Sequence, residues 1–321
     1  MILLRKTKGL RKNYLTLSEI SVLLKFIIMK ALLFLLLVVM LSSCSERAAN
    51  EAAAKEFHEV YSESMDRTLG VTVVLPGSYQ AGQADYPVIY LLHGATGNNR
   101  SWTEDPVRDS LIHDLSDQYG IIFVMPDGDP FSFYIDSPWN PESQFETFVS
   151  YEVVSFIDDN FRTVAGRDGR AITGLSMGGH GALYLSARNP GLYSVAGSMS
   201  GAVDIDAGRW NMPEENIRGF MERISEVLGS EHTDPDFLSE HSVSNMTGLM
   251  KENGIPLIID CGIDDFLLEA NRMMNSNLSD DGVPHDYIER PGRHDWPYWT
   301  NAILYQVLFI SEVFRQNGVL N

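Results

Sequence analysis

The sequence predicts an α/β fold, in which a doubly wound, mostly parallel sheet forms a single domain with a short cap insertion. Three observations lead to this prediction. Short apolar segments alternate with segments of helical periodicity between residues 71 and 314, which is the order of repeated βαβ units. The apolar segments are almost unbroken, as expected of parallel strands that helices cover on both faces. The composition, 44% hydrophobic and 21% charged, is that of a folded globular protein.

The N-terminal residues 1–43 are interpreted as a separate, lipoprotein-type signal segment. Eleven consecutive apolar residues, 31–41, follow Met29-Lys30, and two serines and Cys44 come directly after them. A positive start, a short apolar core and small residues at its end are the parts of an export signal. The pattern Leu-Ser-Ser-Cys resembles the lipobox of bacterial lipoproteins, whose cysteine is lipidated. We therefore expect a lipid anchor at Cys44 and a location in the bacterial cell envelope, in the periplasm or on the cell surface.

Two other interpretations of this segment remain open, an uncleaved membrane anchor and a buried helix. The apolar run is shorter than the ~20 residues that span a bilayer. Extending it back to Ile20 brings in Lys25 and Lys30, which are costly in hydrocarbon. Residues 1–28 are long for the positive part of a signal, so Met29 is a candidate start of translation.

Charge separates this segment from the rest of the chain. The protein has 24 Lys and Arg against 43 Asp and Glu, a net charge of −19. The first 43 residues hold seven basic and one acidic side chain, which leaves 17 basic and 42 acidic ones, a net of −25, for residues 44–321. So acidic a body argues against a nucleic-acid partner, and two cysteines exclude a disulfide framework. Residues 44–58, rich in Ala and Glu, are predicted to be a tether, and residues 59–321 the folded domain.

The elements of the domain follow in order. Strands are predicted where short β-branched and apolar runs end at Gly or Pro, at 71–75, 88–92, 121–125, 171–173, 195–199, 257–259 and 287–290. Helices are predicted where apolar residues recur at i, i+3 and i+4, at 145–157, 182–187, 266–278 and 302–314. Residues 203–250 break this alternation with clustered charges and are interpreted as the cap-like insertion.

The first candidate site residue is Ser176, in Gly174-Leu175-Ser176-Met177-Gly178. The segment lies between a predicted strand and a helix of small residues. G-x-S-x-G in that position is typical of a nucleophile elbow, a sharp turn that exposes the serine hydroxyl. A Gly-rich turn without a catalytic role can have the same sequence, so the prediction depends on the position of the motif between a strand and a helix.

The loop His93-Gly94-Ala95 follows the strand predicted at 88–92. Attack on an ester builds negative charge on the carbonyl oxygen, and preplaced backbone N–H groups stabilise it. The N–H groups of Ala95 and Met177 are the candidate donors of this oxyanion hole. We interpret His93 as a structural residue that braces the loop.

Asp265 and His294 follow the last two predicted strands. A carboxylate after the strand at 257–259 can orient a histidine, and Asp265 is preferred because its spacing from Gly262 puts it on the loop; Asp264 is the alternative. His294 lies between the last strand and the last helix. The order Ser176, Asp265, His294 is the order of catalytic triads in α/β-hydrolases.

Together these segments resemble the esterase D-like branch of the α/β-hydrolases. That group comprises carbohydrate esterase family one with its feruloyl and acetylxylan esterases, S-formylglutathione hydrolases and mycolyltransferases. The likeness runs from about residue 66 to 318, and its motifs are Tyr90-Leu91-Leu92-His93-Gly94, Gly174-Leu175-Ser176-Met177-Gly178-Gly179, Asp260-Cys261-Gly262 with Asp265-Phe266-Leu267, and Gly292-Arg293-His294-Asp295-Trp296.

The resemblance implies an α/β-hydrolase fold and a role for each site residue. Ser176 is then the nucleophile, His294 the general base and acid, and Asp265 the carboxylate that orients His294, with Ala95 and Met177 as oxyanion donors. The implied chemistry is two-step acyl transfer through an acyl-enzyme, with no metal and no cofactor.

Aromatic residues and the export signal indicate the substrate. Trp102, Trp210 and Trp296 are the candidate pocket residues, because aromatic faces stack on sugars and cinnamoyl rings, although packing in the core explains such residues equally well. Further aromatic residues on these loops are Phe131, Phe133, Tyr134, Trp139 and Trp299. We expect removal of acetyl or feruloyl groups from carbohydrate esters outside the inner membrane.

Several alternatives stay open for the function. They are acyl transfer to sugar hydroxyls, an S-formylglutathione hydrolase-like thioesterase, a peptidase, and an inactive glycan-binding lipoprotein. Hydrolysis of S-formylglutathione takes place in the cytosol, which argues against this function for an exported protein. No oligomeric state is predicted.

Overall fold

The computed structural model describes residues 18, 29–30, 53–229 and 234–320. The chain divides into two units, residues 1–52 and 53–321. The predicted signal segment and the lipidation site Cys44 lie outside the described residues, apart from three positions of the segment. Within the described ranges, no helix has both the length and the apolar character needed to cross a membrane.

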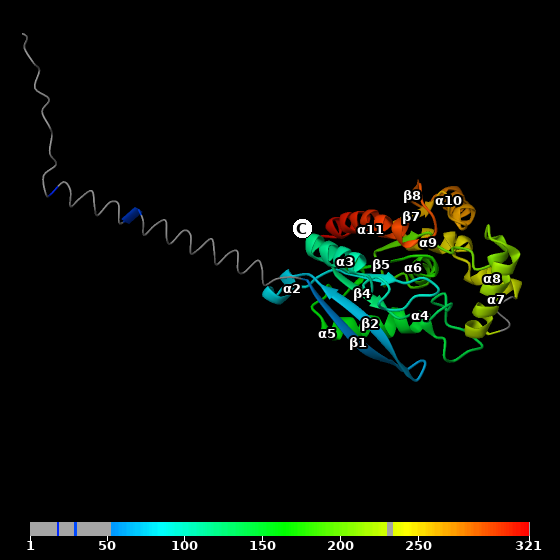
Figure 1. Cartoon of the computed structure of the whole chain (residues 1–321), viewed down its shortest axis with the longest axis horizontal. Coiled ribbons are helices and arrows are strands. Elements are labelled where there is room, and N and C mark those ends of the chain that lie inside the picture. Colours follow the sequence, from blue (N-terminus) through cyan, green and yellow to red (C-terminus); the bar gives the residue numbers. More distant parts are fainter. Residues whose placement is uncertain (1–17, 19–28, 31–52, 230–233, 321) are drawn as a thin grey trace, which may run out of the picture. The chain divides into compact units, whose positions relative to one another are not determined.

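An eight-stranded sheet in the order β1-β2-β4-β3-β5-β6-β7-β8 forms the centre of the domain (Figure 1). All neighbours from β4 to β8 in that order are parallel, and β1 and β2 continue the sheet as antiparallel strands. The prediction of a doubly wound, mostly parallel sheet is confirmed. The strands are β1 (Ala54–Ser62), β2 (Arg67–Leu75), β3 (Val88–Leu92), β4 (Ile122–Pro126), β5 (Arg170–Gly174), β6 (Val195–Met199), β7 (Leu257–Gly262) and β8 (His285–Arg290).

Strand β1 corrects the predicted tether, which extended to residue 58. Residues 54–58 belong to β1, which pairs with β2 from Ala54 opposite Leu75 to Ser62 opposite Arg67. The Ala, Glu and Lys of this segment have low strand propensity, and no apolar run marks it. The strand forms because β2 offers it a free edge, and only its last residues alternate between exposed and buried positions.

Alternate side chains of the strands point to opposite faces of the sheet, and each face carries its own hydrophobic cluster. On one face α3 (Pro106–Tyr119) and α11 (Trp296–Gln316) cover the sheet. The other face is covered mainly by α5 (Val154–Asn160), α6 (Met177–Arg188) and α10 (Leu268–Asp281). The short α2 (Ser78–Ala81) follows β2, and α4 (Phe145–Thr147) continues through a π-helical segment (Phe148–Val153) into α5.

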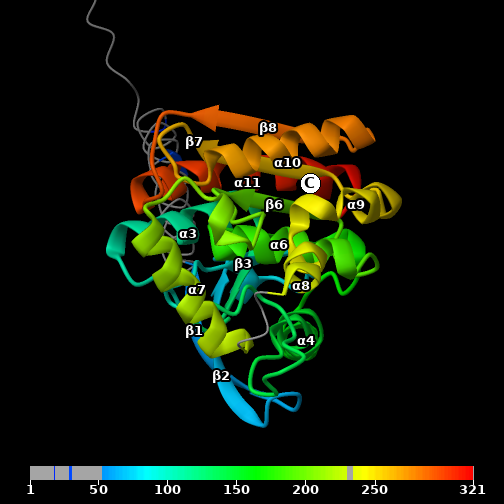
Figure 2. The ribbon, with the colours of Figure 1, turned by 90° about the vertical axis from the view of Figure 1, so that its right-hand side faces the viewer.

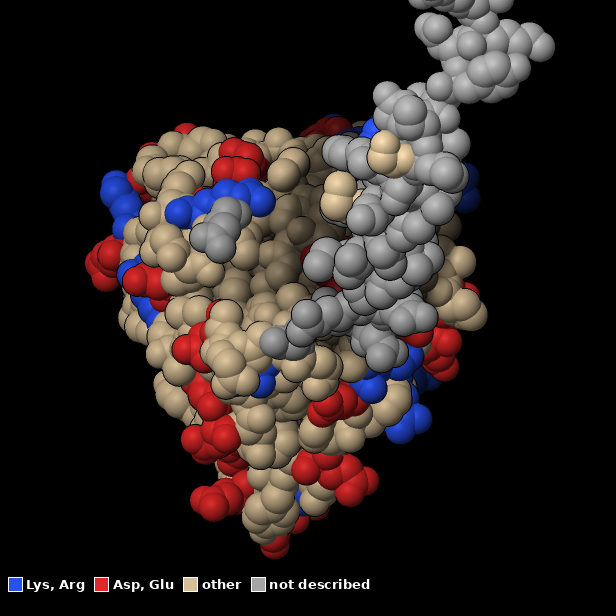
Figure 3. Space-filling model, turned by 90° about the vertical axis from the view of Figure 1, so that its left-hand side faces the viewer, with Lys and Arg blue, Asp and Glu red and all other residues tan. Residues whose placement is uncertain are grey.

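The predicted insertion, residues 203–250, lies between β6 and β7 and is mostly helical. Its described residues contain α7 (Glu214–Leu228), α8 (Pro235–His241), the start of α9 (Thr247–Asn253) and short 3-10 turns at Ala207–Arg209 and Val243–Asn245. Figures 1 and 2 both place α7 and α8 at the same end of the domain. Figure 3 shows the face at the opposite end, where acidic side chains gather over the lower part, as the acidic composition predicts.

Candidate active site

The predicted triad residues and Ala95 lie on loops that follow parallel strands. Ala95 comes after β3, Ser176 after β5, Asp265 after β7 and His294 after β8. The carboxyl ends of parallel strands meet at one edge of a sheet, which is where sites form in open α/β folds. The sheet therefore brings together residues that are up to 199 positions apart in the sequence.

Ser176 occupies a strained turn directly before α6. Its φ of 55° and ψ of −117° lie in a region that non-glycine residues rarely adopt. Its N–H donates to the carbonyl of Met199 at 2.9 Å, which ties the turn to the end of β6. The turn needs glycine on both sides: a Cβ on Gly174 would lie 2.5 Å from the Gly178 oxygen, and one on Gly178 would lie 2.6 Å from the His93 oxygen. This is the geometry of a nucleophile elbow.

A row of hydrogen bonds joins the three candidate catalytic side chains. The distance between Ser176 Oγ and His294 Nε2 is 2.9 Å, and His294 Nδ1 lies 2.9 Å and 3.1 Å from the two oxygens of Asp265. A carboxylate only accepts, so Nδ1 carries the proton and Nε2 is left to accept from the serine hydroxyl. This is the tautomer that a general base for serine needs.

The structure brings Asp265, and not Asp264, to the histidine. The Asp265 side chain is fully buried, and its Oδ1 also accepts the N–H of Leu267 at 2.9 Å. Asp264 is exposed, and among the described residues it is bound only through its backbone N–H, which donates to the Gly292 carbonyl at 2.9 Å. A chain reversal after Gly262 thus turns two adjacent carboxylates to different surroundings.

The Ala95 N–H is oriented through its own peptide plane. The carbonyl of that peptide, on Gly94, accepts from His93 Nδ1–H at 2.8 Å and from the Gly97 N–H at 2.9 Å. The Gly128 N–H donates to His93 Nε2 at 2.8 Å, which fixes the ring as the Nδ1–H tautomer. In a trans peptide the N–H points away from the C=O, so these bonds set the direction of the Ala95 N–H. His93 is 1% exposed and braces the loop as expected.

Met177 is the first residue of α6, and the first N–H groups of a helix have no partner within it. Among the residues that the structure describes, neither the Met177 N–H nor the Ala95 N–H has a hydrogen-bond acceptor. Both flank Ser176, Met177 in the chain and Ala95 across the cavity. They can therefore receive a developing oxyanion.

A cavity of about 390 Å³ opens over Ser176 and His294. Aromatic side chains form part of its lining, namely Phe220, Phe266, Trp296 and Trp299. Besides Ser176 and His294, the polar side chains of its lining are Thr96, Ser101, Glu104 and Arg108. Phe220, Glu104 and Arg108 were not predicted from the sequence, although Asp105-Pro106, a helix start, marks the wall on which Glu104 and Arg108 lie.

Two of the three predicted pocket tryptophans do not line this cavity, so the prediction is wrong for Trp102 and Trp210. Trp102 is 1% exposed and donates its indole N–H to the Leu92 carbonyl at 3.3 Å. Trp210 donates to the Asp204 carbonyl at 2.8 Å. Both rings pack behind residues that line the cavity. Trp102 packs against Trp296, and Trp210 packs against Phe220 and Phe266. Each indole is drawn inward because its N–H finds a buried carbonyl.

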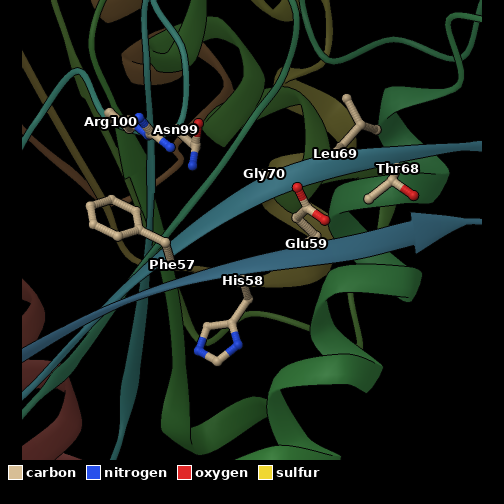
Figure 4. A pocket seen from close by; sticks show the side chains of 8 residues that line it. All are labelled: Phe57, His58, Glu59, Thr68, Leu69, Gly70, Asn99 and Arg100. Carbon is tan, nitrogen blue, oxygen red and sulfur yellow. The ribbon is translucent and has the colours of Figure 1, made fainter.

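A second cavity of about 580 Å³ is larger but contains none of the candidate catalytic residues. Its lining comes from β1, β2 and the loop with Asn99 and Arg100 (Figure 4). The Arg100 guanidinium lies 4.9 Å from the Phe57 ring, and the Asn99 amide donates to Thr72 at 3.1 Å. We therefore place the candidate site by its chemistry and not by cavity volume. Within the described ranges, no group of three His, Cys, Asp or Glu side chains is arranged to hold a metal ion.

Comparison with known proteins identifies the family. Residues 62–310 match the model of the family described as Esterase. The chain belongs to this esterase family. The family and the fold predicted from the motifs are thereby confirmed, and the prediction of a serine esterase is confirmed at the level of the family.

Three relatives show the extent of the similarity. An esterase of Mycobacterium tuberculosis is 32% identical over 248 residues, which cover 70% of this chain and 52% of that protein. The chain thus spans about half the length of this relative. An acetyl esterase of Caldicellulosiruptor saccharolyticus is 31% identical over 231 residues, covering 70% of this chain and 83% of the relative. The solved structure of a ferulic acid esterase is 26% identical, covers 83% of this chain and 100% of its own, and superposes with a TM-score of 0.67.

Proposed function

We propose that the protein is a serine carboxylesterase that removes acetyl or feruloyl groups from carbohydrate esters. The row of hydrogen bonds from Asp265 through His294 to Ser176 is the observation that carries this proposal. Membership of the esterase family supports the reaction type. Similarity to an acetyl esterase and to a ferulic acid esterase supports the choice of acyl group.

Acylation follows from the geometry of the site. Ser176 Oγ forms a bond to the ester carbonyl carbon while His294 Nε2 takes its proton, and buried Asp265 stabilises the resulting imidazolium. The carbonyl oxygen, now negative, accepts from the N–H groups of Ala95 and Met177. The bond to the alcohol oxygen then breaks, and His294 donates the proton to that oxygen. The alcohol leaves, and the acyl group stays on Ser176.

Deacylation repeats these steps with water. His294 Nε2 takes a proton from water, the resulting hydroxide attacks the acyl carbonyl, and the same two N–H groups hold the oxyanion. The Ser176 oxygen is then the leaving group and receives the proton back. Removal of one oxyanion donor lowers turnover by about 100- to 1000-fold in other hydrolases, and we expect a loss of that size here.

A substrate panel with a matched variant tests this function. Methyl ferulate, acetylated xylan and 4-nitrophenyl acetate are incubated with the wild type and with Ser176→Ala. We expect the wild type to cleave at least one of the first two, and the folded variant to lose nearly all turnover. Cleavage of the nitrophenyl ester alone would exclude the carbohydrate substrate, and an active, folded Ser176→Ala variant would exclude the mechanism.

The lipid anchor at Cys44 is also a proposal, supported by the apolar run and small residues that precede it. Expression of the full chain in a bacterium should place the protein in the membrane fraction, with residues before Cys44 removed and acyl chains added. Mass spectrometry of the purified N-terminus measures this. Cys44→Ala should abolish the modification, and an unmodified Cys44 in an intact N-terminus would contradict the proposal.

A further inference from the structure

We infer that Glu104 and Arg108 form the subsite for the alcohol half of the substrate, and that this subsite selects a neutral sugar ring with neighbouring hydroxyl groups. The inference rests on the proposed function and deepens it. It begins with two charged side chains that line the cavity over Ser176 and that the mechanism does not use.

Arg108 is held in one orientation with its outer nitrogens unused. Its Nε donates to the Ser101 carbonyl at 2.9 Å, and its guanidinium carbon lies 4.0 Å from the centre of the Trp296 ring. These two contacts fix the plane of the guanidinium. The Nη1 and Nη2 atoms have no acceptor among the described residues, so a preoriented pair of donors remains for a ligand in the cavity.

Glu104 supplies acceptors to the same cavity. It precedes Asp105, the cap of α3, and lies four positions before Arg108. Its carboxylate is exposed, and within the described ranges it forms no hydrogen bond and no ion pair, with Arg108 or any other residue. The same cavity thus offers a fixed donor pair and a carboxylate acceptor.

This combination favours hydroxyl groups over the other ligand classes. A hydroxyl both donates and accepts, so neighbouring hydroxyls on a ring can satisfy Glu104 and Arg108 together. An anionic group would gain from Arg108 but meet repulsion from Glu104 at close range. A purely apolar group would strip water from both charges without replacing their hydrogen bonds.

The position of His294 assigns this wall to the alcohol half. In acylation His294 Nε2 gives its proton to the leaving oxygen, so the alcohol must lie on the histidine side of Ser176. Trp296 follows His294 by two residues, and the Trp299 ring lies 5.0 Å from the imidazole. The Trp296 ring in turn carries the Arg108 guanidinium. The leaving alcohol therefore departs along the wall that presents Arg108.

The same contacts change the role expected of Trp296. Arg108 covers one face of its ring, and the ring also meets Trp102 edge-on at 5.2 Å. Trp296 thus serves as a platform for the guanidinium rather than as a surface on which a sugar stacks.

Two acetate esters that share a ring size test the inference. The probes are a monoacetate of methyl β-xylopyranoside, whose ring keeps its free hydroxyls, and cyclohexyl acetate, whose ring has none. For wild type, Glu104→Gln and Arg108→Gln, the quantity measured is the ratio of kcat/KM for the xyloside ester to that for the cyclohexyl ester. Arg100→Gln is the matched control, because Arg100 lies eight residues earlier and stacks on Phe57, outside this cavity.

We expect each site variant to lower this ratio about tenfold through a higher KM for the xyloside ester, the effect of losing a hydrogen bond to a charged group. Arg100→Gln should leave the ratio within about twofold of wild type. Equal losses on both esters would overturn the inference, because they would indicate a structural role. A uronic-acid ester whose hydrolysis Glu104→Gln improves and Arg108→Gln weakens would also overturn it in favour of an anion subsite. Failure of the wild type on every ester would instead reject the proposed function itself.

Discussion

Replacing Asp265 with Asn tests the hydrogen-bond row at its most specific point. Asp265 Oδ1 accepts the Leu267 N–H, while Oδ2 lies 2.9 Å from His294 Nδ1. In the variant the amide oxygen can keep the bond to Leu267, which turns the NH₂ group toward Nδ1. NH₂ only donates and takes the position nearer to Nδ1, at 2.9 Å against 3.1 Å for the amide oxygen, so we expect Nδ1 to become the acceptor and the ring proton to move to Nε2. Nε2 then points a proton at Ser176 and cannot act as the base.

The magnitude follows from this change of tautomer. The equivalent substitution in a serine protease triad lowers kcat by ~10⁴-fold, which corresponds to about 5 kcal/mol of lost transition-state stabilisation at 1.36 kcal/mol per factor of ten. We expect a loss of ~10³- to 10⁴-fold in kcat for Asp265→Asn, because here too a buried carboxylate next to Nδ1 sets the tautomer of the base. The assay is steady-state hydrolysis of 4-nitrophenyl acetate, with thermal unfolding as the check on folding.

Asp264→Asn is the matched control, with the same change of charge one residue earlier. Asp264 is exposed, and its side chain has no hydrogen bond to the imidazole within the described structure. We expect its kcat to stay within about threefold of wild type, since surface substitutions cost little. A large loss in Asp264→Asn with a small loss in Asp265→Asn would refute the assignment of the triad carboxylate.

Two further predictions concern the cavity wall and the buried charge beneath the site. Phe220 lines both the cavity over Ser176 and a neighbouring cavity of about 400 Å³. Phe220→Ala should therefore join the two cavities and raise the preference for 4-nitrophenyl butyrate over 4-nitrophenyl acetate roughly tenfold. An unchanged preference would mean that acyl groups do not reach Phe220. Burial raises the pKa of Asp260 from 3.8 to about 6, against the opposing effects of Gln306 and Arg290. Between these two pH values the folded protein keeps a proton on Asp260 that the unfolded chain releases. The protonated Asp260 therefore contributes about 3 kcal/mol to the free energy of unfolding, in full below pH 3.8, and this contribution is lost as the pH rises through 6. Urea unfolding from pH 4 to 7 should show this decline for the wild type but not for Asp260→Asn, and parallel curves for the two proteins would contradict it.

The parallel strands and the triad could be predicted because each has a local signature. Buried parallel strands are short apolar runs, and the site residues follow them at strand ends that any doubly wound sheet gathers at one edge.

Other features depend on tertiary contacts that leave no local pattern. Strand β1 forms because β2 offers an edge, not because its own residues favour a strand. The tryptophans were predicted to line the pocket because of their residue type. In the structure, the position of each ring depends on where its indole N–H finds an acceptor, which for Trp102 is the Leu92 carbonyl. Phe220 reaches the cavity from the inserted α7, and only the fold shows that it does so.

The central claim is that Ser176 is activated by His294 and Asp265 to carry the acyl group. Labelling with a fluorophosphonate, followed by peptide mapping by mass spectrometry, measures this most directly. We predict one label per chain, on Ser176, with a labelling rate that falls by orders of magnitude in His294→Ala and in Asp265→Asn but not in Asp264→Asn. A label on another residue, or active esterase that takes no label at Ser176, would contradict the account.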